Sequence, residues 1–125
     1  AVTVLTNLTD TDLKQQGINL STSDLVLQRA RLAHEAGFNG VIASGLEAAA
    51  IRAATDPSFL IVTPGIRLTG GTTDDQERVM TPEHAITSGA NHIVVGRPIT
   101  QADDPVQVAE TFLAHIQKAK GVTTH

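Results

Sequence analysis

The chain has 125 residues, and we expect residues 1–125 to form a single domain. Hydrophobic residues make up 41% of it, as is ordinary for a soluble globular protein. A net charge of −4, with nine scattered Lys and Arg, argues against nucleic acid as a partner, and the longest apolar runs are too short to span a membrane. Cysteine is absent, which excludes disulfides and thiolate zinc sites and fits a cytoplasmic location.

The first third of the chain predicts one strand and two helices. Residues 2–5 are apolar or β-branched and predict a strand, although the chain starts directly inside it, which suggests a fragment or a processed product. Residues 10–16 predict one or two helical turns that end at Gly17. Ser21, with Asp24 three residues later, resembles a capping box for a longer helix that ends at Gly37.

The remaining two thirds alternate between strands and helices. Strands are predicted at residues 38–44, 60–62 and 92–95, and the second of these has no polar alternation, which is typical of a parallel strand buried on both faces. Helices are predicted at residues 46–54, 83–88 and 106–118. Thr81 and Pro82 supply an N-cap and a first-turn proline for the helix at 83–88.

Four strand–helix units in this order predict an α/β fold with a parallel sheet and right-handed crossovers. Such units could form an open doubly wound sheet, or half of a (β/α)₈ barrel, since a complete barrel needs about 250 residues. We favour half of a TIM (β/α)₈ barrel, because each predicted strand is followed by a loop with polar side chains. In such barrels these loops carry the active site.

Two of these loops contain the best candidates for an anion site. Arg67 follows the strand at 60–62, and Arg97 follows the strand at 92–95 directly after Gly96. Glycines and threonines at 70–73 offer backbone N–H groups and hydroxyls, and Gln76 adds an amide donor. The simpler interpretation is a flexible surface loop and, for Arg97, a surface salt bridge. Two strand-end arginines in neighbouring loops favour one shared anion.

These residues also carry a resemblance. The segments VTVLT (2–6), VIAS (41–44), VTPGIR (62–67), DQERVMTP (75–82) and VVGRPIT (94–100) resemble, in order and spacing, the C-terminal half of bacterial orotidine 5′-phosphate decarboxylases. The resemblance implies a homodimeric lyase that needs no cofactor and converts orotidine 5′-phosphate to uridine 5′-phosphate in pyrimidine biosynthesis. It implies substrate-binding roles for Thr6, Ser44, Arg67, Gln76, Gly96 and Arg97, with Ser44 near the pyrimidine amide.

The same resemblance implies that the chemistry lies elsewhere. The family uses an Asp/Lys network from the N-terminal half of the barrel, and Lys14, Lys118 and Lys120 match none of its positions. We therefore expect no catalytic residue in this chain and no decarboxylase activity from it alone. The expected partners are the nucleotide and either the missing N-terminal half-barrel or a second copy of the chain.

No metal is expected, because the five histidines are dispersed and the paired aspartates are typical of solvated turn caps. The loop at 70–75 is expected to close over bound substrate and to be mobile without it.

Two other interpretations stay open. Related phosphate-binding barrels include sugar-phosphate decarboxylases and epimerases, which share the last two loops. A half-barrel could also be a non-catalytic assembly or phosphate-binding module. Its open sheet face and strand edges would favour self-association over a stable monomer.

Overall fold

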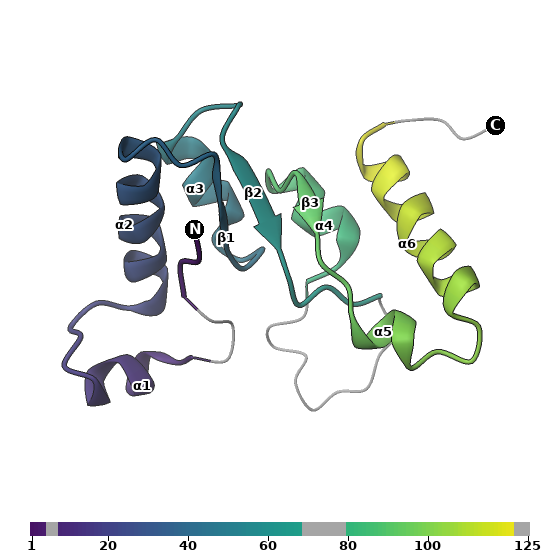
Figure 1. The fold of residues 1–125 in the computed structure, drawn as a ribbon, viewed down its shortest axis with the longest axis horizontal. Helices are drawn as coiled ribbons and strands as arrows, with labels where there is room; N and C mark the ends of the chain where they lie inside the picture. The colour runs from purple at the N-terminus through teal and green to yellow at the C-terminus, as the bar shows by residue number, and fades with distance from the viewer. Residues whose placement is uncertain (5–7, 69–79, 122–125) are drawn as a thin grey trace.

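The structure is a computed structural model that describes residues 1–4, 8–68 and 80–121 (Figure 1). Three parallel strands form a sheet in the order β1-β2-β3. The strands are β1 (Gly40–Ile42), β2 (Leu60–Thr63) and β3 (His92–Ile93). The helices are α1 (Asp10–Gln15), α2 (Thr22–Glu35), α3 (Ala48–Ala54), α4 (Pro82–Thr87), α5 (Arg97–Thr100) and α6 (Pro105–Ala119).

The predicted first strand is reduced to an edge segment beside β1. Val2 forms an isolated parallel bridge with Ile42, and the Thr3 backbone N–H donates to the Ile42 carbonyl at 3.2 Å. The Arg29 guanidinium of α2 donates to the Thr3 carbonyl at 2.5 Å, which ties this segment to the helix beside it. Leu5, the end of the predicted strand, lies outside the described residues.

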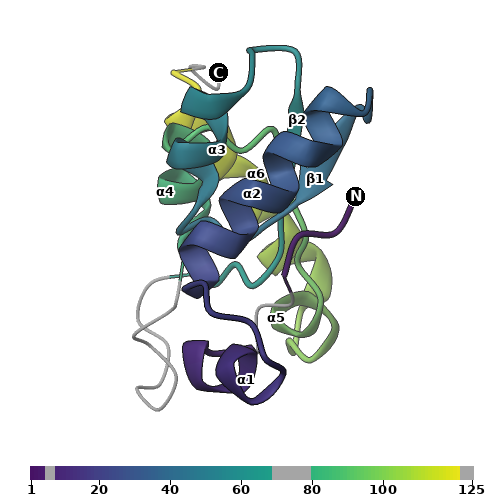
Figure 2. The ribbon, with the colours of Figure 1, turned by 90° about the vertical axis from the view of Figure 1, so that its left-hand side faces the viewer.

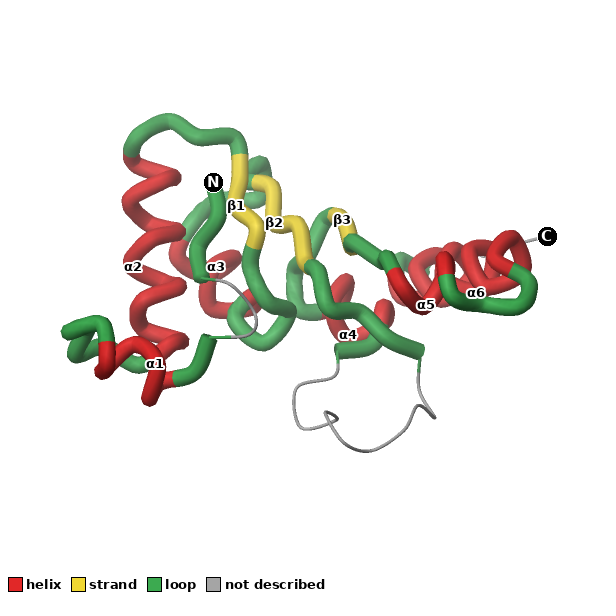
Figure 3. The backbone as a smooth tube through the Cα atoms, turned by 60° about the horizontal axis from the view of Figure 1, so that its bottom comes forward, coloured by secondary structure: helices red, strands yellow, loops and turns green. Residues whose placement is uncertain are grey.

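Helices α2, α3 and α4 pack against one face of the sheet. In Figure 2, α3 and α4 lie to the left of the strands, and Figure 3 shows the three strands side by side with α6 beyond α4. Ile61 and Thr63 of β2 point toward the helices and are fully buried, whereas Leu60 is 39% exposed. The prediction that this strand is buried on both faces is therefore wrong for the chain by itself. No described element covers the second face.

Capping side chains set the helix starts, although only one of the two hydrogen bonds of the capping box predicted at Ser21 and Asp24 is recorded. The Ser21 and Thr81 hydroxyls accept the N–H groups of Asp24 and His84, and Pro82 opens α4 as predicted. The Asp104 carboxylate accepts the Gln107 N–H at 3.1 Å and caps α6. The short helix α5 was not expected. It is initiated by Pro98 in its first turn.

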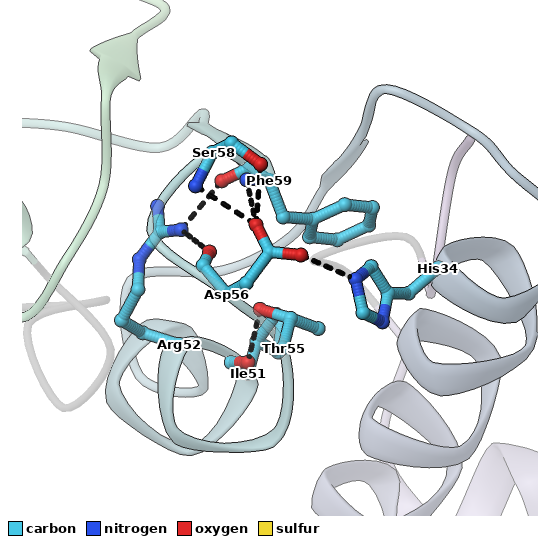
Figure 4. A network of polar contacts seen from close by, with 7 residues as sticks. All are labelled: His34, Ile51, Arg52, Thr55, Asp56, Ser58 and Phe59. Atoms are coloured by element: carbon cyan, nitrogen blue, oxygen red, sulfur yellow. Dashed lines mark hydrogen bonds and ion pairs between the residues drawn. The ribbon is translucent and has the colours of Figure 1, made fainter.

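The ends of the strands where the chain enters the sheet are joined by one side chain. Arg52 of α3 donates to the carbonyls of Asp56 at 2.6 Å and Phe59 at 2.5 Å, just before β2 (Figure 4). The same guanidinium donates to the Gly89 carbonyl at 2.9 Å and to the Asn91 side-chain oxygen at 2.7 Å, just before β3. We call Arg52 and these four partners the Arg52 clamp. It fixes the start of β2 against the start of β3.

A second set of contacts surrounds Asp56 in the same loop. Its carboxylate accepts the Ser58 N–H at 2.8 Å and the Phe59 N–H at 3.0 Å, and it lies 2.8 Å from the His34 imidazole (Figure 4). The hydrogen bond from the Ser58 hydroxyl, followed by the His34 contact, lowers the pKa of Asp56 to about 2. The loop that leads into β2 is thus held from within and also from α2.

Candidate functional site

The strand pairing puts the two candidate arginines at equivalent positions. Val62 of β2 is in register with His92 of β3, and Arg67 and Arg97 each follow their registered residue by five positions. Parallel strands end at the same edge of a sheet, so both arginines leave the sheet on the same side. This edge is opposite the Arg52 clamp.

Arg67 is held by the backbone around it. Its N–H donates to the Met80 carbonyl at 3.0 Å, and the preceding residue, Ile66, forms a parallel bridge with Met80. Ile66 is fully buried and Met80 nearly so, which anchors the chain directly beside the arginine. The guanidinium donates to the Ile66 carbonyl at 3.0 Å and is partly exposed. Its other N–H donors have no recorded partner within the described residues.

Arg97 begins the short helix α5 immediately after Gly96 and is exposed. The Thr100 N–H donates to the Gly96 carbonyl at 3.1 Å, and the Gln101 N–H donates to the Arg97 carbonyl at 2.9 Å. These bonds close one helical turn just beyond β3. Arg97 forms no ion pair within the described ranges, where the recorded pairs are His34 with Asp56 and His115 with Glu83. The surface salt bridge considered for Arg97 is thus not seen there.

Arg67 and Arg97 line one surface pocket of about 420 Å³. Its other lining residues are Pro98, Gln101 and Ala102, so the described lining carries two positive charges and no carboxylate. An arginine offers several N–H donors in a planar fork, and two of them can bind one oxyanion from different sides. The pocket is therefore suited to an anion of the size of a phosphate group.

The other predicted site residues have different outcomes. Ser44 lies two residues after β1, where its hydroxyl accepts the Leu46 N–H at 3.2 Å, and it is not part of the arginine pocket. Its carbonyl accepts the Glu47 N–H, and Glu47 lines another pocket of about 530 Å³ beside α1. Gly96 directly precedes the pocket residue Arg97. Thr6, Gln76 and the loop at 70–75 lie outside the described residues.

Sequence reasoning missed Gln101, the third polar residue of the arginine pocket. An indication was present, because proline directly after Gly96-Arg97 is typical of the first turn of a helix. A helix that starts there brings residue 101 onto the same face as Arg97. No group of three or more acidic or histidine side chains in the described part of the chain could hold a metal ion. Nor is any helix there long and apolar enough to cross a membrane.

Comparison with known proteins identifies the family of this chain. The orotidine 5′-phosphate decarboxylase / HUMPS family matches residues 1–112. The chain belongs to this family. An orotidine 5′-phosphate decarboxylase of Trichlorobacter lovleyi is 50% identical over 116 residues, which are 93% of the chain and 48% of that protein. One of Methylorubrum extorquens is 50% identical over 119 residues, 95% of the chain and 51% of that protein.

Solved structures of the family show the same fold. The crystal structure of orotidine 5′-phosphate decarboxylase from Lactobacillus acidophilus matches with a TM-score of 0.77 and 38% identity, over 93% of the chain and 47% of that protein. The crystal structure of orotidine 5′-phosphate decarboxylase from Pyrococcus horikoshii matches with a TM-score of 0.67 and 25% identity. This match covers 93% of the chain and 49% of that protein. The chain spans about half the length of the relatives it matches, namely their C-terminal half. The predicted half of a TIM barrel is confirmed.

Proposed function

We propose that this chain is the phosphate- and pyrimidine-binding half of an orotidine 5′-phosphate decarboxylase. The reaction would release CO₂ from orotidine 5′-phosphate and leave uridine 5′-phosphate. The observation that carries the proposal is the pocket shared by Arg67 and Arg97 at the carboxyl edge of the sheet, in a chain that belongs to this family. In TIM barrels a phosphate commonly binds between the last two strand-end loops, and β2 and β3 are the last two strands here.

The role of this half would be to supply binding energy. A phosphate far from the reacting carbon contributes nothing to bond breaking itself, but its binding energy can hold the substrate in the reactive geometry. Arginine stays protonated at any working pH, so Arg67 and Arg97 suit a permanent anion and are poor proton donors. We further propose that Ser44, Thr6, Gln76 and Gly96 contact the nucleotide. The proton donor would belong to the N-terminal half of the barrel.

The proposal includes the cellular location of the protein, its need for a cofactor and its association with other chains. The absence of cysteine supports a cytoplasmic location. The resemblance to orotidine 5′-phosphate decarboxylases supports a reaction without a cofactor. The uncovered sheet face supports pairing with an N-terminal half-barrel or with a second copy of the chain, as in a homodimer.

Binding of uridine 5′-phosphate by the 125-residue chain tests the proposal. Arg97→Ala and Arg67→Ala should each weaken binding by roughly 10- to 100-fold, the value of a charge-assisted hydrogen bond. Arg31→Ala, which removes an exposed arginine of α2, is the matched control. Uridine without the phosphate should bind far more weakly than the nucleotide. Equal binding of nucleotide and nucleoside, or no effect of either pocket variant, would refute the proposal.

A second candidate keeps the phosphate and changes the rest of the substrate. Ser44 does not line the arginine pocket, which leaves room for a phosphorylated sugar in place of a pyrimidine nucleotide. Ser44→Ala separates the two candidates. If it leaves the affinity for uridine 5′-phosphate unchanged while Arg97→Ala abolishes binding, the phosphate assignment holds and the pyrimidine assignment fails.

A further inference from the structure

Gln101 is a polar residue at the arginine pocket to which neither the sequence motifs nor the proposed function gives a role. It lies four residues after Arg97, and the hydrogen bond from its N–H to the Arg97 carbonyl fixes both residues on one turn. Residues four apart share a face of a helix, so the two side chains border the same space. Gln101 is exposed, and within the described residues no hydrogen bond is recorded for its side-chain amide.

We propose that Gln101 is a further ligand-binding residue, which donates its side-chain amide N–H groups to the anion held by Arg67 and Arg97. The inference rests on the proposed function and names a further contact of the same site. Two guanidinium groups supply the positive charge for a phosphate, whose terminal oxygens can accept more hydrogen bonds than two side chains fill. A carboxamide adds two N–H donors without further charge.

The surroundings of the pocket support a neutral donor at this position. Pro98 and Ala102 complete the described lining and offer no side-chain donor of their own. Asp104, three residues after Gln101, is occupied as the N-cap of α6. Gln101 is thus the one described uncharged donor side chain in the lining. Its replacement by glutamate would put a negative charge directly beside the bound anion.

Two substitutions of nearly the same size test this role. Gln101→Met removes the donors, and Gln101→Glu keeps the shape and adds charge. The matched controls are Gln107→Met and Gln107→Glu, on an exposed position of α6 outside the pocket. Affinities of the 125-residue chain for inorganic phosphate and for uridine 5′-phosphate are measured by NMR titration, which also follows the side-chain amide signals of Gln101. Urea denaturation verifies that each variant is folded.

We expect Gln101→Met to weaken both ligands about fivefold to tenfold and Gln101→Glu to weaken them more, with no change in the Gln107 variants. The amide signals of Gln101 should shift on addition of phosphate. If Gln101→Met binds phosphate as well as Gln107→Met does, the inference is wrong. It is also wrong if only the nucleotide is affected, because the amide would then contact the sugar or base.

An Arg97→Ala arm separates this inference from the proposed function. If Arg97→Ala loses phosphate and Gln101→Met does not, only the role of Gln101 fails. If the unsubstituted chain binds no phosphate, or if Arg97→Ala binds it normally, the proposed function fails and the inference fails with it.

Discussion

The side-chain oxygen of Asn91 lies 2.7 Å from the Arg52 guanidinium, and the same oxygen accepts the Ile61 backbone N–H at 2.8 Å. One carboxamide thus joins an α3 side chain to the middle strand of the sheet, across 30 and 39 positions of sequence. Ile61 is fully buried, so its N–H would find no water in place of Asn91. Asn91 therefore supplies one of the four contacts of the Arg52 clamp and also links the clamp to β2.

Asn91→Ala should lower the free energy of unfolding by about 2 kcal/mol, because it leaves a buried N–H and a guanidinium donor without their acceptor. Asn91→Asp keeps the acceptor oxygen and should cost clearly less. Urea denaturation measures both, with Asn19→Ala at an exposed position as the control. Equal stability of Asn91→Ala and the control would show that the clamp does not stabilise the fold.

Asp56 should make the chain sensitive to acid. Its pKa is lowered to about 2 in the folded state from an ordinary value of 3.8, chiefly by the Ser58 hydroxyl and then by His34. A lowered pKa stabilises the fold at pH values above about 4, and this contribution is lost as the pH falls from 4 toward 2. Asp56→Asn should be less stable than the unsubstituted chain at pH 5, and the difference should shrink toward pH 2.

Urea midpoints between pH 5 and pH 2 test the acid prediction. Asp103→Asn, at an exposed position of the loop before α6, should follow the unsubstituted chain throughout. If the urea midpoints of Asp56→Asn and the unsubstituted chain differ by the same amount from pH 5 to pH 2, the lowered pKa of Asp56 is contradicted.

Two buried threonines provide a matched pair. The Thr3 hydroxyl donates to the Ile42 carbonyl at 2.9 Å, whereas the Thr63 hydroxyl has no hydrogen-bond partner in the described structure. Both residues are at most 2% exposed. Thr3→Val should destabilise the fold by about 1 kcal/mol, and Thr63→Val should be neutral or stabilising by up to about 1 kcal/mol. Thermal or urea unfolding measures the stability of both variants. An equal loss of stability in Thr3→Val and Thr63→Val would argue against an unpaired Thr63 hydroxyl.

The uncovered sheet face predicts self-association. Leu60 is 39% exposed and Val94 is 49% exposed, on or just beyond neighbouring strands. Exposed apolar area on the face of a sheet favours association. Sedimentation at micromolar concentration should show species larger than a monomer, and Leu60→Glu should shift them toward the monomer. Leu32→Glu, at an exposed position of α2, is the control. A compact monomer of the unsubstituted chain would contradict the prediction.

The 125-residue chain by itself should show no measurable decarboxylase activity. Loss of CO₂ leaves a carbanion that must be stabilised and protonated in place, and binding groups alone supply little of that rate. Addition of the N-terminal half of a relative should restore some activity if the halves dock along the open strand edges. Turnover by the chain alone, with full-length enzyme excluded by mass spectrometry, would show that the chemistry has been assigned to the wrong half.

Local patterns predicted much of this fold. Thr81 with Pro82, and Ser21 with Asp24, act over three or four residues, so the sequence reveals them directly. The arginine pocket was also foreseeable, because Arg67 and Arg97 follow two parallel strands by similar distances. The ligand roles of all six predicted site residues stay predictions, those of Arg67 and Arg97 as well as those of Ser44, Gly96, Thr6 and Gln76.

The Arg52 clamp could not be read from the sequence, since its partners are backbone carbonyls and one carboxamide from two separate loops. No residue pattern marks a carbonyl as an acceptor for a distant side chain. The lengths of the strands predicted at 38–44 and 92–95 were also overestimated. Strand ends are assigned by pairing, and residues 94–95 and 43–44, although apolar or small, continue past the last paired positions.

The Arg52 clamp and the arginine pocket lie at opposite ends of the same strands, and this separation has a consequence for how the protein can change. Substitutions around Arg97 alter what is bound without touching the contacts that start β2 and β3. Substitutions at Asn91 change the free energy of unfolding without changing ligand preference. The effects of substitutions at distant sites on the free energy of unfolding generally add. The arginine pocket can therefore evolve, or be engineered, toward new ligands while stabilising substitutions are introduced around the Arg52 clamp.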